Sequence, residues 1–405
     1  MTSSPHSTHA RARVGPLVAH HDPALVLDVD SLLDDPNRNI IVCCGSGGVG
    51  KTTTSAAMAL RAAERGRKVV VLTIDPARRL AQAMGIEELD NTPRPVPGVG
   101  ETGGGSLDAM MLDMKRTFDE VVQSQASPEK AAAILANPFY VAVSSSFAGT
   151  QEYMAMEKLG QLDKLARKSG RWDLIIVDTP PSRSALDFLD APERLSSFLD
   201  GRFMRLLLAP ARGPARLMTA GFGMVTNAVT RIIGAQTLQD MRAFVAAFDT
   251  LFGGFRQRAQ RTFELLQDRR TAFLVVAAPE PDALREAAYF VERLRQEGMP
   301  LAGLVVNRAS TSPEVDLSAN VAMAGVEKLR SSGEDHGLAA GLLRLHADRK
   351  VLVEREKRLT SRFATSHPDV PTAVLPALST DVHDLDGLRR IGDLLGAQVE
   401  TGIEP

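Results

Sequence analysis

The feature that most constrains this chain is a glycine-rich segment that directly follows a short apolar run. The apolar run is Asn39 to Cys44 (NIIVCC), and the glycine-rich segment is Gly45 to Thr52 (GSGGVGKT). The segment fits the pattern G-x-x-x-x-G-K-[ST], and a helix-forming stretch, Thr53 to Arg65, follows it. A strand, a glycine loop and a helix in this order form a P-loop, which binds nucleotide phosphates through backbone amides and a helix N-terminus.

The residues of this loop have distinct predicted roles. Lys51 is expected to reach the β- and γ-phosphates and to act in catalysis, and the Thr52 hydroxyl is expected to bind Mg²⁺. The residues predicted to hold the nucleotide are Gly47, Gly48, Val49, Gly50, Lys51, Thr52 and Thr53. The alternative is a glycine-rich turn between strand and helix that has no ligand.

Further apolar runs alternate with helix-forming stretches along the chain. They are Arg67 to Ile74, Leu174 to Val177, Ala272 to Ala278, Leu301 to Val306 and Ala373 to Leu375. Short β-branched runs of this kind are typical of parallel strands that are buried on both faces. The sequence therefore predicts an α/β fold, a P-loop NTPase whose mostly parallel twisted sheet is flanked by helices.

The long intervals between these runs define the expected domain organisation. Residues 1–36 show no sustained periodicity and are expected to form a mobile N-terminal arm with one short helix near Leu25 to Leu33, whereas 37–405 form the P-loop domain. Helical insertions are expected at about 115–170, 190–266 and 312–365, and the second forms a helical subdomain. Gly98 to Ser106 is expected to be a flexible surface loop, and the mixed charges of 349–358 indicate a solvated helix face.

Composition excludes several classes of protein. Lys and Arg number 47 against 49 Asp and Glu, a net charge of −2 that argues against nucleic-acid binding. The N-terminus has no apolar core of a secretory signal and no stretch is apolar enough to span a bilayer, so a cytoplasmic protein is expected. The only two cysteines, Cys43 and Cys44, are adjacent within the first predicted strand, where apolar packing is expected.

Two aspartates follow predicted strands at the edge where ligands bind to open α/β sheets. Asp75 follows the second strand and is predicted to orient a water molecule for attack on the γ-phosphate; the alternative is a helix N-cap for the segment from Pro76. Asp178 ends the run Leu174 to Val177 as in a Walker B strand and is predicted to hold Mg²⁺. Thr179 to Ser182 would then form a loop that senses the γ-phosphate. The alternative for Asp178 is a structural role as a capping aspartate.

Two later positions are predicted to contact the nucleotide base. Asn307, in the sequence VVNR at 305–308, is placed to pair with the adenine edge. The segment around Pro279 could close over the base. The alternative is that both segments are ordinary turns between strand and loop.

Four segments together carry a family resemblance: GSGGVGKTT at 45–53, IDPAR at 74–78, DTPPSRSALDFL at 178–189 and VVNR at 305–308. They resemble the deviant Walker A ATPases of the arsenite-pump and tail-anchored-protein targeting family. The resemblance implies ATP and Mg²⁺ as ligands, a dimer, and a helical subdomain beside each ATPase core. It also implies that Asp75 activates the lytic water and that Asp178 belongs to switch II.

The sequence departs from that family in three respects. Ser46 stands where the family has its signature lysine, so weak hydrolysis by the isolated chain is expected. Either a lysine-bearing paralogue completes the site in a heterodimer, or the chain forms a slow or substrate-gated homodimer. No spaced cysteines could capture arsenite. The helical stretch keeps apolar residues that could form a client groove, a helical core or a dimer contact: Met204, Leu206 to Leu208, Met218, Phe222, Met224 and Val225.

The resulting functional hypothesis is a cytoplasmic ATPase that couples ATP hydrolysis to conformational change in its helical subdomain. The expected client is a membrane-protein segment or a transporter. The alternative is a nucleotide-sensing regulatory subunit with little hydrolysis of its own.

Overall fold

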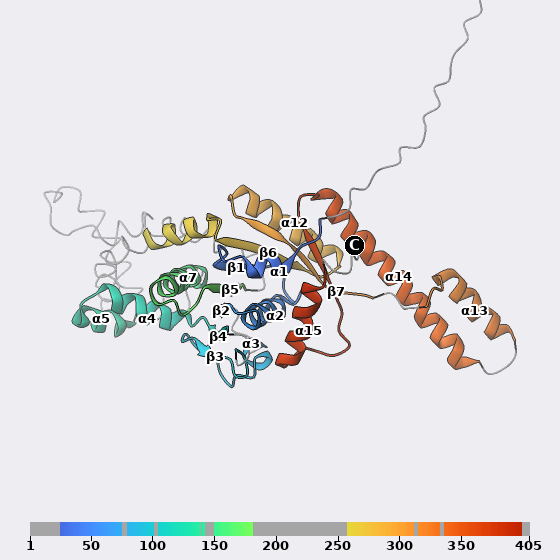
Figure 1. Ribbon diagram of the computed structural model, residues 1–405, viewed down its shortest axis with the longest axis horizontal. Helices are drawn as coiled ribbons and strands as arrows, with labels where there is room; N and C mark the ends of the chain where they lie inside the picture. The colour runs from blue at the N-terminus through green and yellow to red at the C-terminus, as the bar shows by residue number, and fades with distance from the viewer. Residues whose placement is uncertain are drawn as a thin grey trace, which may run out of the picture.

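A computed structural model describes residues 25–74, 79–100, 104–138, 140–141, 150–180, 257–311, 315–332 and 336–398. The predicted catalytic Asp75, the segment that follows Pro180 and the predicted client groove lie outside these ranges. The residues that are described form a sheet with helices on both faces, as Figure 1 shows.

The sheet has eight strands in the order β3-β4-β2-β5-β1-β6-β7-β8. Their bounds are Arg94–Pro95 (β3), Ser106–Met111 (β4), Lys68–Thr73 (β2), Leu174–Asp178 (β5), Ile40–Cys44 (β1), Thr271–Ala277 (β6), Leu301–Ala309 (β7) and Thr372–Pro376 (β8). All neighbours pair in parallel except β3 and β4, which are antiparallel. This confirms the predicted fold class, a mostly parallel sheet buried between helical layers.

Alternate side chains of each central strand enter two separate cores. In β1, Ile40, Val42 and Cys44 contribute to one core, while Ile41 and Cys43 contribute to the other. The second core is covered by α1 (Val29–Asp34), α2 (Lys51–Glu64), α3 (Arg79–Ala83) and α15 (Leu385–Gly396). The first is covered by α4 (Met114–Gln125), α5 (Pro128–Leu135), α7 (Thr150–Ser169), α12 (Pro281–Gln296) and helical residues 257–267.

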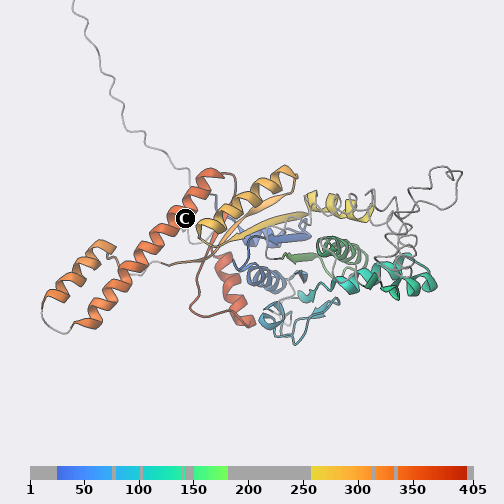
Figure 2. The same cartoon turned by 180° about the vertical axis from the view of Figure 1, so that it is seen from behind.

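A helical hairpin extends from one end of the molecule. It consists of α13 (Ala319–Ser331) and the 30-residue α14 (Gly337–Ser366), and both views show α13 and the outer part of α14 beyond the sheet (Figures 1 and 2). The base of the hairpin is held to the end of β7, because the Ser310 amide and hydroxyl donate to Glu356 at 2.6 and 3.0 Å.

The region between β2 and α4 differs from the sequence-based expectation. Gly98 to Ser106 was expected to be a surface loop, and Gly98 and Gly104 are indeed exposed and outside any helix or strand. The end of the segment differs, because Gly105 lies against the Ala63 carbonyl oxygen, 2.0 Å from where a Cβ would stand, and Ser106 begins β4. The sequence of β4, SLDAMM, has no β-branched residue and an aspartate at its centre. Asp108 is tolerated inside the fold because the Trp172 indole and the Arg171 guanidinium donate to its carboxylate at 2.8 and 3.0 Å.

The start of the domain also needs correction. Residues 25–36 were assigned to the mobile arm, but Leu27, Val29 and Leu33 are buried in the core that α2 covers. Val26 also forms a parallel bridge with Thr372, the first residue of β8. Because Leu27, Val29 and Leu33 are buried in the core, residues 25–36 are part of the domain. None of the helices in the described ranges is long and apolar enough to cross a membrane.

Candidate nucleotide-binding site

The predicted P-loop lies at the carboxyl edge of the sheet, after its central strand. β1 has β5 on one side and β6 on the other, and the chain continues from β1 to β2 on the β5 side. This is the point at which the strand order reverses, where open α/β sheets bind ligands. The parallel register places Asp178 opposite both Cys43 and Thr73, so the carboxylate stands directly beside the loop that leaves β1.

Two glycines with positive φ allow the loop to turn sharply and lead directly to the N-terminus of α2. Gly48 and Gly50 have φ of 76° and 92°, in the left-handed region that favours glycine. Within the described part of the chain, no side chain caps the helix that begins at Lys51. Such an N-terminus leaves amide donors for an anionic ligand, and the helix dipole adds a positive potential.

Lys51 is held against this loop. Its side chain is buried, at 5% exposure, and its ammonium donates to the Ser46 carbonyl oxygen at 2.8 Å. A buried ammonium is stabilised by acceptors and anions close to it. The position of the charge therefore favours phosphate oxygens as ligands inside the curve of the loop.

Asp178 joins two neighbouring strands to the first turn of α2. Its Oδ2 accepts hydrogen bonds from the hydroxyls of Thr52, at 2.7 Å, and Thr73, at 2.8 Å, and the side chain is fully buried. One carboxylate and one hydroxyl within contact are the oxygen ligands that Mg²⁺ takes together with water and phosphate. Thr52 and Asp178 thus fit the predicted metal site. The next residue, Thr179, is anchored to β1, since its hydroxyl donates to the Cys43 carbonyl at 2.8 Å.

Asn307 has a contact that sequence reasoning missed. Its side-chain amide donates to the Val49 carbonyl oxygen at 2.8 Å, and its Oδ1 accepts from the Arg308 amide at 2.9 Å. Arg308 adopts a φ of 62°, at an irregularity in the β7–β8 register. Asn307 therefore braces the P-loop from the end of β7. Its contact with adenine stays a prediction, as does that of Pro279, which is buried between β6 and α12.

This brace predicts different effects for alanine at the two left-handed glycines. A Cβ on Gly50 would stand 2.2 Å from the Asn307 amide nitrogen, whereas one on Gly48 would meet nothing within 4 Å. Gly48→Ala should cost only the left-handed conformation, about 1–2 kcal/mol. Gly50→Ala should cost about 1–3 kcal/mol more, because Asn307 must move away from Val49.

Urea unfolding of the nucleotide-free protein measures both free energies. The double variant Gly50→Ala/Asn307→Ala relieves the steric conflict and serves as a control for it. Equal losses for the two single glycine variants would show that Asn307 does not brace the loop.

The two cysteines lie deep in the sheet beside this loop. Cys43 and Cys44 are fully buried, and burial raises the pKa of both thiols, that of Cys44 to about 12. A thiol in such surroundings stays protonated and packs as a small apolar side chain.

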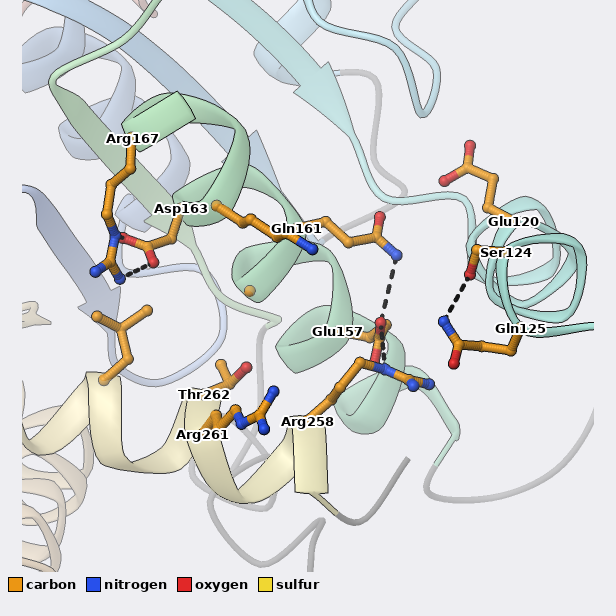
Figure 3. A pocket seen from close by; sticks show the side chains of 13 residues that line it. Glu120, Ser124, Gln125, Glu157, Gln161, Asp163, Arg167, Arg258, Arg261 and Thr262 are labelled. Carbon is orange, nitrogen blue, oxygen red and sulfur yellow. Dashed lines mark hydrogen bonds and ion pairs between the residues drawn. The ribbon is translucent and has the colours of Figure 1, made fainter. Parts of the chain in front are cut away.

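A second, polar cavity lies between α7, α4 and helical residues 257–267 (Figure 3). It has a volume of about 690 Å³ and its charged lining residues are Glu120, Glu157, Asp163, Lys164, Arg167, Arg258 and Arg261. The Arg258 Nε approaches both carboxylate oxygens of Glu157, at 3.0 and 2.9 Å, and Glu157 is 7% exposed. The sequence showed no sign of this ion pair, which joins segments 101 residues apart.

Close packing accompanies the ion pair. Gly160 on α7 faces Thr262, whose hydroxyl would lie 2.6 Å from a Cβ at that glycine. On the other side of the cavity, Lys158 donates to Glu120 of α4 at 2.9 Å. Helical residues 257–267 are thus fastened to α7, and α7 to α4.

The fold and the site define a class of protein. A P-loop after the central strand of a mostly parallel sheet, with a threonine hydroxyl and a strand-end aspartate in contact, is the site of a P-loop nucleoside triphosphatase. The model of the anion-transporting ATPase family matches residues 38–324. The chain belongs to this ATPase family.

Curated relatives agree with this assignment. The chain is 26% identical over 295 residues to the "ATPase GET3" of Malassezia globosa, covering 72% of this chain and 79% of the relative. It is 27% identical to the "ATPase ASNA1 homolog" of Cryptosporidium parvum over 65% of this chain and 63% of the relative. The "ATPase ASNA1 homolog" of Plasmodium berghei is 21% identical but aligns over 91% of this chain and 89% of the relative.

Proposed function

We propose that this chain binds ATP with Mg²⁺ on its P-loop and couples hydrolysis to conformational change in its helical part. The client we propose is a membrane-protein segment or a transporter, and the place of action is the cytoplasm. The observation that carries the nucleotide part is the contact of Thr52 with Asp178 at the N-terminus of α2. Family membership and the relatives' names support ATP as the nucleotide.

Different residues of the site are proposed to bind the phosphates, the metal, the attacking water and the base. Amides from Gly47 to Thr53 would hold the phosphates, and Lys51 would neutralise the β- and γ-phosphate oxygens. Thr52 and Asp178 would hold Mg²⁺, which when bound offsets negative charge on the phosphates. Asp75, which follows β2, would orient the attacking water, while Asn307 keeps the loop in shape and is proposed to pair with adenine next to Pro279.

The contacts of α7 suggest how the helical part is coupled to the nucleotide. α7 ends at Ser169, five residues before β5, the strand that carries Asp178. Helical residues 257–267 are fastened to α7 by Glu157 and Arg258, and they end four residues before β6. A movement of Asp178 on nucleotide binding would therefore reach the helical part through α7 and its buried ion pair.

Dimerisation is part of the proposal. Ser46 stands where the resembling family has its signature lysine, and a serine cannot place a cation on the phosphates of a partner. We infer a heterodimer with a lysine-bearing paralogue, or a homodimer that turns over slowly until a client binds. The competing function, a nucleotide-sensing regulatory subunit, requires the same site but no turnover.

Replacing Asp75 with asparagine tests the proposed function directly. The variant should bind ATP with unchanged affinity, because Asp75 is not expected to hold the phosphates, but its turnover should fall by about two to three orders of magnitude. Calorimetry measures the binding, and phosphate release measures the turnover, with and without the candidate paralogue.

The wild-type chain alone should hydrolyse ATP slowly. Vigorous turnover by a purified homodimer would refute the role assigned to Ser46. Unchanged turnover of Asp75→Asn would refute hydrolysis through Asp75 and favour the regulatory alternative.

A further inference from the structure

The hairpin of α13 and α14 carries an unusual number of exposed apolar side chains. On the first half of α14, Leu338, Leu342 and Leu345 are 81%, 58% and 65% exposed, and Leu352 is 40% exposed. These residues follow one another at intervals of four, three and seven, so they form one stripe along the helix. We call these four residues the leucine stripe.

The leucine stripe faces away from α13. α14 packs against α13, with Leu343 close to Gly325, and Ala340 and Ala347 are buried on the same side of α14 as Leu343. At 100° per residue, Leu338, Leu342 and Leu345 lie on the opposite side of α14. The two helices of the hairpin therefore pack against each other through one face of α14, and the leucine stripe on the opposite face has no partner in the described residues. Figures 1 and 2 place this part of α14 away from the sheet.

The charge of α14 indicates the kind of partner. The helix carries seven basic residues and three acidic ones, a net charge of +4 in a chain whose total is −2. With α13 and the acidic residues of 333–335 included, 315–366 still has nine basic and seven acidic residues, or +2. Within the described residues, no basic side chain of α14 forms an ion pair with a carboxylate.

From this combination we propose that the leucine stripe docks the protein on the surface of an anionic phospholipid bilayer. A helix with leucines along one face and most of its arginines and lysines on the other faces is the type that lies in the membrane interface. Long side chains such as Arg344 and Arg355, which lie outside the stripe, can reach the phosphates while the leucines enter the acyl boundary. The site is distinct from the P-loop, so the inference does not depend on the proposed ATPase cycle.

Arg349 argues against a second copy of the chain as the partner. It continues the spacing of the stripe, between Leu345 and Leu352, and its guanidinium is oriented towards the Thr311 carbonyl and hydroxyl at 3.2 and 3.4 Å. In a seam between two copies of α14, this arginine would be buried against leucines, and the two helices would bring like net charges together. At a bilayer surface the same charge meets lipid phosphates.

Vesicle co-sedimentation of the full-length protein tests the proposal. The probes are phosphatidylcholine vesicles and vesicles with about one-quarter phosphatidylglycerol. We expect binding to the anionic vesicles to exceed binding to the neutral ones by at least about tenfold, and to weaken at high salt.

Substitutions assign that binding to the leucine stripe. Leu342→Glu/Leu345→Glu should lower the affinity for anionic vesicles by at least about tenfold, while Leu165→Glu, at a leucine of α7 that is 45% exposed, should leave it unchanged. Circular dichroism confirms that each variant is folded, since all three sites are on the surface.

Three results would overturn the inference. The first is the absence of any preference for anionic vesicles, and the second is wild-type vesicle binding by the stripe variant. The third is that the wild-type protein sediments as a dimer and the stripe variant as a monomer, while both bind vesicles equally. That last result would assign the stripe to a second copy of the chain. A protein that binds anionic vesicles but does not hydrolyse ATP would contradict the proposed ATPase function and would support the membrane-docking proposal.

Discussion

Lys51→Ala is expected to lower ATP turnover by about a thousandfold and to abolish measurable ATP binding. The ammonium of Lys51 is held at the Ser46 carbonyl, inside the curve of the loop, and is 5% exposed. A charge in such a position acts on the phosphates in surroundings that contain little water, where it stabilises the transition state far more than a surface charge does. Removing it leaves the developing phosphate charge without its cation.

The measurements for Lys51 are calorimetric titration with ATP and phosphate release at saturating Mg²⁺. Lys130→Ala is the matched control, because Lys130 lies exposed on α5, away from the P-loop. Thermal unfolding shows whether each variant keeps its fold. Turnover of a folded Lys51→Ala protein within a few-fold of wild type would contradict the assignment of this loop as the nucleotide site.

Arg258→Ala is expected to destabilise the protein by about 3 kcal/mol, because it leaves the Glu157 carboxylate buried without its cation. Glu157 retains weaker neighbours, the Tyr153 hydroxyl at 3.2 Å and the Gln161 amide at 3.5 Å. Burial and the Glu157 charge together raise the pKa of Tyr153, so this hydroxyl stays protonated and can donate but cannot supply positive charge.

The single tryptophan of the chain provides the signal for this experiment. Trp172 lies between α7 and β5, is 3% exposed and donates to Asp108, so its fluorescence reports on the unfolding of this region. Arg261→Ala, one helical turn further on and exposed, should change the free energy of unfolding by less than about 0.5 kcal/mol.

A second substitution tests whether the unpaired charge is the cause of the loss. Glu157→Gln in the Arg258→Ala background removes that charge and should recover about half of the lost stability. If Arg258→Ala were as stable as Arg261→Ala, the ion pair would not fasten helical residues 257–267 to α7, and the proposed coupling route would lose its support.

Much of the nucleotide site could be predicted because its signals are local. The residues from Gly45 to Thr52 are consecutive, and their glycines specify the backbone turn whatever surrounds them. Asp178 could be predicted because it ends an unbroken apolar run, and its contact with Thr52 follows from parallel strands that end at the same edge. Six strands were visible for the same reason.

Other contacts of the site could not be read from the sequence. The brace from Asn307 to Val49 spans 258 residues, and the bond from Glu157 to Arg258 spans 101. No local pattern marks such pairs, since each residue alone is compatible with an exposed position. β4 was missed because its aspartate, which Trp172 and Arg171 satisfy, appears in the sequence as a break in an apolar run.

The sequence by itself determined a phosphate loop, a strand-end aspartate that is proposed to hold Mg²⁺, and the order of strands and helices that carries them. These features depend on residue type and short spacing, which the chain keeps in any fold. Only the tertiary structure decided which distant side chains brace the loop, which charges are paired inside the protein, and which leucines of α14 remain exposed. Those outcomes depend on which surfaces meet, and burial, unlike local propensity, is a property of the whole packed molecule.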